Sequence, residues 1–214
     1  MTKITTSFTN AVLTKNKQAV HDIHLPSKNV AVYQRDIAPL QSELAQIMTK
    51  SIECRANGSA EDVLATLQDF FVQRLPHCPT LLKDVSELFK LFKVTTRAAS
   101  FRLLLTTIST NMCRKFHTDI NDLRLLCTYI GPGTIWLPDE AVDFEALQSK
   151  SSAKDVVKNP ELVQQVQTGE VIILKGALYP EARPILHRSP IIEEAGINRL
   201  LLRIDTNANQ NLWM

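Results

Sequence analysis

Two residues that can bind a metal ion, His117 and Asp119, lie two positions apart in a polar segment between two apolar, strand-like runs. Residues at this spacing in an extended chain project from the same face, so the imidazole and the carboxylate can reach one cation. A third ligand must come from elsewhere in the chain, and His187 is the best candidate. The sequence therefore predicts a metal site formed by these three residues. The alternative is a turn between strands, with His187 as an unrelated surface histidine.

Two imidazoles and one carboxylate on one face of a metal leave coordination positions open. This arrangement is typical of non-haem Fe(II) oxygenases, because oxygen and a cosubstrate must both bind the iron. Zinc accepts the same ligands, with water in the fourth position. The ligand types therefore do not distinguish between iron and zinc as the bound metal. We predict no catalytic side chain beyond the three ligands.

Two arginines near the C-terminal end, Arg199 and Arg203, lie four positions apart and share a strand face with Leu201. If that face points into a barrel, the buried guanidiniums need an anionic partner, and a dicarboxylate cosubstrate would serve. If it points to water, the alternate leucines form the core instead, and the periodicity leaves both arrangements open. Tyr129 either offers its hydroxyl to a ligand inside the barrel or is a core residue with a solvated tip.

The elements that must position these residues begin with three helices. Apolar residues recur at helical spacing over residues 40–48, 63–75 and 81–92. Ser59 and Asp62 precede the second of these segments with the spacing of a capping box. Each apolar stripe is wide enough to pack against another element of the fold.

Most of the remaining ordered chain has the composition of strands. Runs rich in Leu, Ile, Val and Thr predict strands over residues 30–33, 101–108, 122–130, 134–137, 171–176 and 199–205. The polar residues 114–119 are expected to form a further extended piece between two of these strands. Helices followed by strands predict an α+β fold, in which residues 1–94 buttress a β-sandwich or barrel of residues 95–214 within one structural unit. The polar segment 140–168 is either a lid over a cavity or a passive surface loop.

The composition argues against several kinds of partner and location. The chain has 214 residues, a formal net charge of +2 and no basic stripe with interleaved aromatic residues, so nucleic acid is not an expected partner. The apolar runs are too short to span a bilayer, and the N-terminal residues lack the apolar region of a secretion signal. The four cysteines form no CxxC pair and are expected to be buried thiols. We therefore expect a cytoplasmic protein that does not enter membranes. The sequence does not predict its oligomeric state.

The order of these motifs resembles that of the Fe(II)/2-oxoglutarate-dependent dioxygenases. The resemblance rests on His117-Thr118-Asp119, on RLLCTYIGPGTIWLPD and GEVIILKG, and on His187 followed by the two late arginines. It implies a double-stranded β-helix, a jelly-roll or cupin-like barrel, on which the N-terminal helices pack. It also implies that His117, Asp119 and His187 bind iron, and that Arg199 or Arg203 holds the far carboxylate of 2-oxoglutarate.

More closely, the whole chain resembles an uncharacterised bacterial family, domain of unknown function 1826. The phrases FHTDINDLRLLCTYIGPGTIWLPD, HRSP and RLLLRIDT carry this resemblance. Members of that family tend to be associated with zinc homeostasis, which keeps zinc open as the metal.

These inferences lead to one expected function and two alternatives. The expected function is an oxygenase that decarboxylates 2-oxoglutarate while it oxidises an unknown small-molecule or protein substrate. The first alternative is a non-enzymatic metal-binding protein that uses the same three residues for zinc homeostasis, sensing or storage. The second is a metal-free barrel that acts as a binding module.

Overall fold

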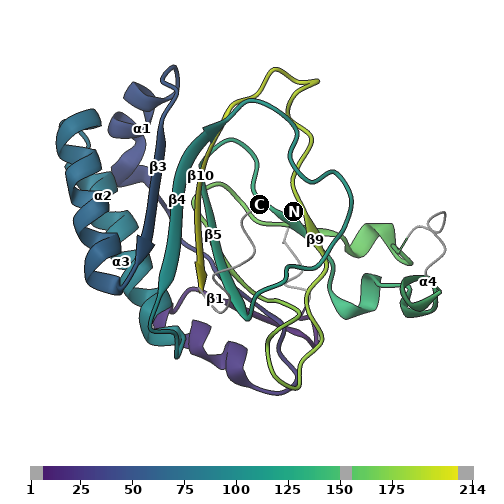
Figure 1. Cartoon of the computed structure of the whole chain (residues 1–214). Coiled ribbons are helices and arrows are strands. Elements are labelled where there is room, and N and C mark those ends of the chain that lie inside the picture. Colours follow the sequence, from purple (N-terminus) through teal and green to yellow (C-terminus); the bar gives the residue numbers. More distant parts are fainter. Residues whose placement is uncertain (1–6, 150–155, 207–214) are drawn as a thin grey trace.

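The computed structural model describes residues 7–149 and 156–206, and its centre is a seven-stranded sheet in the order β1-β2-β8-β5-β10-β4-β3. Neighbouring strands in this main sheet are antiparallel, except for the parallel pair β1 and β2. A smaller sheet has the order β7-β6-β9. Figure 1 shows α1, α2 and α3 on one side of the main sheet, with β9 and α4 on the other. The fold is therefore α+β with a large, mainly antiparallel sheet.

The elements have the following bounds. The main sheet contains β1 (Ala11–Thr14), β2 (Val30–Tyr33), β3 (Glu53–Gly58), β4 (Phe101–Ile108), β5 (Leu123–Ile130), β8 (Val171–Lys175) and β10 (Arg199–Thr206). The smaller sheet contains β6 (Ile135–Trp136), β7 (Gln164–Gln165) and β9 (His187–Arg188). The α-helices are α1 (Gln41–Ile47), α2 (Ala60–Arg74), α3 (Pro79–Thr95) and α4 (Phe144–Gln148). Short 3-10 helices are η1 (Lys17–His24), η2 (Ala38–Leu40), η3 (Asp139–Ala141) and η4 (Pro160–Leu162).

The three predicted helices are confirmed as α1, α2 and α3. The capping box of Ser59 and Asp62 begins α2, with both of its hydrogen bonds present. No side-chain cap comes from the residue before α3, and Glu43 of α1 takes that place. Its carboxylate accepts hydrogen bonds from the backbone N–H groups of Thr80 and Leu81, at 2.9 and 2.8 Å. A negative charge at a helix N-terminus is stabilising, so this contact ties α1 to α3.

The main sheet separates two apolar cores. On its helix face, Leu200, Leu202 and Ile204 of β10 belong to the core that contains the α2 and α3 side chains. On the opposite face, called the inner face below, Leu201 packs in a second core with Trp136 of β6 and residues of β2, β5 and β8. Side chains alternate along a strand, so Arg199 and Arg203 lie on the inner face together with Leu201. This settles an orientation that the sequence pattern left open.

Several strands differ from the predicted ones. The sequence ECRANG of β3 gave no strand signal, yet it pairs with β4 along its whole length. With β1 and β2, it brings three strands from residues 1–94 into the main sheet, so the sheet spans both predicted parts of the chain. Residues 114–119, expected as a strand, form only one isolated bridge, through His117. Whether these segments form strands depends on pairing with distant parts of the chain, and the β-propensity of the segment alone does not predict such pairing.

The polar segment 140–168 contains short elements rather than one long loop. It includes η3, α4, η4 and β7, while residues 150–155, a part of the segment predicted as either a lid or a passive loop, lie outside the described residues. Within the described ranges, none of the helices has the length and apolar character needed to cross a membrane.

Candidate metal centre

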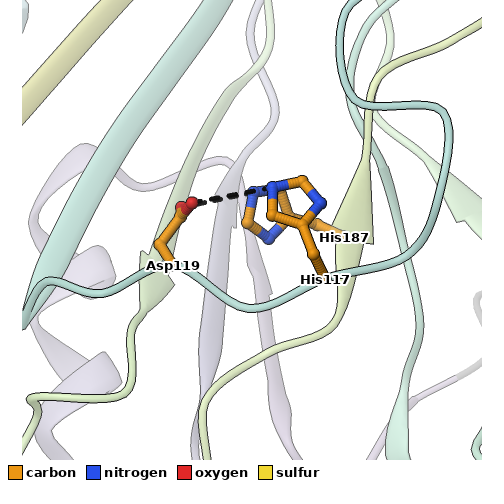
Figure 2. Close-up of side chains that lie close together, drawn as sticks. All are labelled: His117, Asp119 and His187. Carbon is orange, nitrogen blue, oxygen red and sulfur yellow. Dashed lines mark ion pairs between the residues drawn. The ribbon is translucent and has the colours of Figure 1, made fainter. Parts of the chain in front are cut away.

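His117, Asp119 and His187 converge, as Figure 2 shows. Each offers one potential ligand atom, and the three atoms lie within 4.8 Å of one another. Nε2 of His187 is 3.2 Å from Oδ2 of Asp119, and Nε2 of His117 is 3.7 Å from Oδ1. The two imidazole centroids are 4.6 Å apart. The tertiary structure thus brings together the three residues that the sequence predicted as ligands.

Backbone hydrogen bonds hold the two histidines side by side. His117 lies in the connection between β4 and β5, and His187 begins β9. Their backbones form an antiparallel bridge, in which each N–H donates to the other carbonyl at 3.0 Å. The backbone of Asp119 is held by a hydrogen bond from the N–H of Ala177 to the Asp119 carbonyl, at 2.8 Å. Three separate segments therefore set the geometry of the cluster.

Gly176, directly after β8, allows the segment that carries Asp119 to approach the end of this strand. Its N–H donates to the carbonyl of Asp122 at 2.8 Å. A Cβ at this position would collide with the side chain and the backbone carbonyl of Asn121. Only glycine avoids that collision, so the final glycine of VIILKG has a positional role near the cluster.

The second nitrogen of each imidazole faces a backbone carbonyl. Nδ1 of His117 is 3.1 Å from the carbonyl of Lys115, and Nδ1 of His187 is 3.4 Å from that of Ile185. A carbonyl only accepts, so in the neutral rings Nδ1 carries the proton and Nε2 presents a lone pair toward Asp119. Carbonyls that orient a metal-binding histidine act in this way. With the rings in this tautomer, two nitrogen lone pairs and a carboxylate face one another, an arrangement that suits a cation between them.

Asp119 is a carboxylate with one oxygen available. Its side chain is only 10% exposed, and this burial opposes ionisation, but His187 and Arg124 outweigh it and lower the pKa of Asp119 to about 2. Nη1 of Arg124 lies 2.5 Å from Oδ1 of Asp119. Oδ2 is buried and accepts no hydrogen bond from the described residues. This orphaned oxygen, between two imidazoles, fits a cation-binding role.

A chain of ion pairs extends from the cluster across the main sheet. Nε of Arg124 is 2.5 Å from Oδ1 of Asp205, and Nε of Arg203 is 3.2 Å from Oδ2 of the same carboxylate. Asn121 donates a further hydrogen bond to Asp205 at 3.2 Å. Sequence reasoning missed Arg124 and Asp205 as supporting residues. The available signal was the one charged residue of the otherwise apolar β5 and the one acidic residue of β10, which also carries two arginines.

Arg199 is buried without a counter-charge. The residue is 2% exposed, and its Nη2 donates to the Thr128 hydroxyl at 2.9 Å. Its Nε has no hydrogen-bond partner and no acidic side chain pairs with it, so far as the structure describes the chain. Burial lowers the pKa of Arg199 to about 10. Because a buried charge is costly unless it is paired, the guanidinium is suited to an anionic ligand.

Tyr129 lies on the other side of the sheet. Its ring belongs to the helix-face core, and its hydroxyl donates to Oδ2 of Asp84 in α3 at 2.6 Å. Tyr129 is two residues from Cys127, which shares that core, so strand alternation directs both away from the inner face. Of the two roles that the sequence left open for Tyr129, the structure shows a core residue, but its tip is buried and its hydroxyl contacts Asp84 rather than water or the metal-ligand cluster.

The fold and the cluster together define an α+β protein with a large sheet and a His-Asp-His group. A family model described as "Protein of unknown function (DUF1826)" matches residues 14–205, so the chain belongs to this family, as its sequence phrases predicted. No curated protein sequence matches the chain.

Solved structures similar to this chain include the following three. A prolyl-4-hydroxylase from Pseudomonas putida is 10% identical, with a TM-score of 0.47, over 89% of this chain and 94% of that one. A bsmA homolog from Methylobium petroleophilum is 10% identical, with a TM-score of 0.46, over 88% and 92%. The Fe(II)/(alpha)ketoglutarate-dependent dioxygenase TqaL is 12% identical, with a TM-score of 0.41, over 91% and 75%.

Proposed function

We propose that this protein is an Fe(II)- and 2-oxoglutarate-dependent oxygenase, whose two sheets form a double-stranded β-helix. One observation carries the proposal. An open cluster of two imidazoles and one carboxylate occurs in the same molecule as Arg199, a buried guanidinium without an anionic partner among the described residues. The cluster has the donor set of a facial metal site, and the arginine has the chemistry that a dicarboxylate requires.

In this proposal His117, Asp119 and His187 hold the iron. The two backbone carbonyls accept from Nδ1 and so direct Nε2 of each imidazole toward the metal, and Arg124 engages Oδ1 of Asp119 so that Oδ2 remains for the metal. Bound iron supplies the activation of oxygen and the oxidative decarboxylation of the cosubstrate. No general base from the chain is needed for that chemistry, because the protein orders the reactants and excludes water.

Arg199 rather than Arg203 is the proposed anchor for the far carboxylate of 2-oxoglutarate. Arg203 already pairs with Asp205, whereas Arg199 makes only a neutral hydrogen bond with Thr128 in the described structure. A carboxylate would compensate the buried charge of Arg199 through charge-assisted hydrogen bonds. Leu201, beside it on β10, belongs to the inner-face core and contributes apolar surface there.

The test is an anaerobic titration of metal-free protein with Fe(II) and then 2-oxoglutarate. We expect the weak visible charge-transfer band only when both are present, and succinate formation after air is admitted. Arg199→Met should lose the band at cosubstrate concentrations that saturate the wild type. Arg114→Met, at an arginine whose side chain is 60% exposed, is the matched control and should keep it.

Zinc fits the same three donors, so metal content must be measured in protein purified from iron-replete and from zinc-replete cells. If the protein contained stoichiometric zinc and neither metal form bound 2-oxoglutarate, the proposed oxygenase function would be wrong, and a non-enzymatic zinc-binding function would take its place.

A further inference from the structure

A groove of about 370 Å³ lies over β3, β4 and β10. Its lining includes three arginines, Arg55, Arg102 and Arg203, together with Asn57 and Leu104. We call it the arginine groove. Its volume is within the range of small-molecule sites. None of its lining residues is acidic.

Strand alternation places these side chains on the inner face. Cys54 and Ala56 of β3 and Leu103 of β4 belong to the helix-face core. Their neighbours Arg55 and Arg102 therefore point to the opposite side of the sheet, as Arg203 does. The groove thus opens on the same face as Arg199 and Arg124.

The strand register connects the groove to the metal-ligand cluster. Arg102 lies opposite Asp205 of β10, and Asp205 lies opposite Arg124 of β5. Neighbouring strands are about 4.8 Å apart, so Arg102 is roughly 10 Å across the sheet from Arg124. Arg124 contacts Asp119 directly. The ion pairs that start at Asp119 therefore end at Arg203, which lines the groove.

The arrangement of side chains in the groove is suited to a molecule with one charged and one apolar part. Arg203 and Arg55 both lie opposite Leu104, so guanidiniums flank an apolar side chain on neighbouring strands. Asp205 pairs with both Arg124 and Arg203, and Arg55 pairs with Glu53 at the exposed edge. Guanidiniums match the geometry of carboxylate and phosphate oxygens in bidentate contacts.

We propose that the arginine groove binds the carboxylate or phosphate group of a small organic substrate. Arg102 and Nη1 of Arg55, which is not among the nitrogens that donate to Glu53, hold the anionic group. Arg203, paired with Asp205, lines the groove beside them, and Leu104 contacts the apolar part of the molecule. The identification of this ligand as the substrate rests on the proposed oxygenase function. The binding of an organic anion in the groove does not.

The experiment is isothermal titration calorimetry of the metal-free protein with two probes, phenyl phosphate and benzoate. We expect saturable binding of at least one probe, and the tighter of the two identifies the preferred anionic group. Arg55→Gln/Arg102→Gln should weaken that binding at least tenfold. Lys90→Gln/Lys93→Gln removes the same charge from the exposed side of α3 and should leave the affinity within twofold.

Three results would overturn the proposal. The first is no saturable binding of either probe by the wild type. The second is an equal loss in the control double variant, because the effect would then be nonspecific. The third is a loss in Arg199→Met but not in Arg55→Gln/Arg102→Gln, because the probe would then bind at Arg199.

A second variant guards against misfolding, and the metal titration separates the two proposals. Arg55→Lys/Arg102→Lys keeps the charge but not the guanidinium geometry, and it should bind with an affinity between those of the wild type and the glutamine variant. An intact charge-transfer band without probe binding rejects the groove alone. Probe binding without the band rejects the oxygenase alone.

Discussion

Each face of the main sheet holds an arginine whose side chain is mostly shielded from solvent, and the two arginines differ in how their charge is compensated. On the helix face, Arg35 donates to both oxygens of Asp84, at 2.6 and 2.9 Å, and to the carbonyl of Gly169 at 2.8 Å. On the inner face, Arg199 donates only to the Thr128 hydroxyl among its described contacts, at 2.9 Å.

The pKa values of the two guanidiniums show the same difference. Burial acts against the charge of both. For Arg35, the hydrogen bonds and charge of Asp84 outweigh burial and raise the pKa above its ordinary value. For Arg199, burial is unopposed and lowers the pKa. The charge of Arg35 is thus compensated within the fold, whereas that of Arg199 has no anionic partner among the described residues, which is why we propose Arg199 as the cosubstrate anchor.

Loss of a metal ligand should have the largest effect. His187→Ala should weaken metal binding by roughly three orders of magnitude, since a binding free energy on the order of 10–16 kcal/mol is shared among few ligands. Metal content after dialysis and calorimetric titration measure this. His77→Ala, at an exposed histidine outside the cluster, should bind as the wild type does. Equal metal content in both variants would contradict an inner-face metal site.

Breaking the helix-face ion pair should affect stability rather than binding. Asp84→Ala leaves Arg35 and the Tyr129 hydroxyl without their partner, and it should lower the free energy of unfolding by about 3 kcal/mol. Urea denaturation measures this. Glu87→Ala, at a half-buried position in the same helix where the side chain pairs with Lys17 and Lys90 near the surface, should cost less than about 1 kcal/mol. If Asp84→Ala also removed the metal, the two faces would not be independent.

The two arginines should respond in opposite ways to the same substitution. Arg199→Met removes an uncompensated charge, so it should leave the free energy of unfolding unchanged or higher while it weakens 2-oxoglutarate binding at least tenfold. Arg35→Met leaves Asp84 without its ion-pair partner and should destabilise the protein without a change in cosubstrate affinity. Denaturation and titration of both variants test this pair of expectations. A destabilised Arg199→Met would remove the distinction between the faces.

The smallest effect should come from Glu43 and should depend on pH. Burial raises its pKa, but the hydrogen bonds from Thr80 and Leu81 outweigh burial and hold the pKa of Glu43 below its ordinary 4.5. Its contribution to stability is therefore present above pH 4.5 and is lost as the pH falls through the lower folded value. Glu43→Gln should cost about 1 kcal/mol at pH 7. Unfolding measured from pH 7 to 3 should show the difference from wild type disappear, and a constant difference would contradict this.

Local pattern in the sequence determined much of the fold and part of the site. The helical spacing of apolar residues predicted α1, α2 and α3, because one apolar stripe per helix is a property of the segment itself. The two-residue spacing of His117 and Asp119 predicted that both can reach one cation, although the strand expected over residues 114–119 is only an isolated bridge at His117. The family resemblance rested on contiguous phrases and was confirmed by the match over residues 14–205.

Only the tertiary structure decided which residues meet and which face they occupy. Leu200, Leu201 and Leu202 are all apolar, so alternation in β10 gives no signal for the side on which Arg199 lies. The pairing of β10 between β4 and β5 and the packing of helices on one face determine it. His187 reaches His117 through a two-residue strand that no local pattern marks, because its partner lies seventy positions away in the chain.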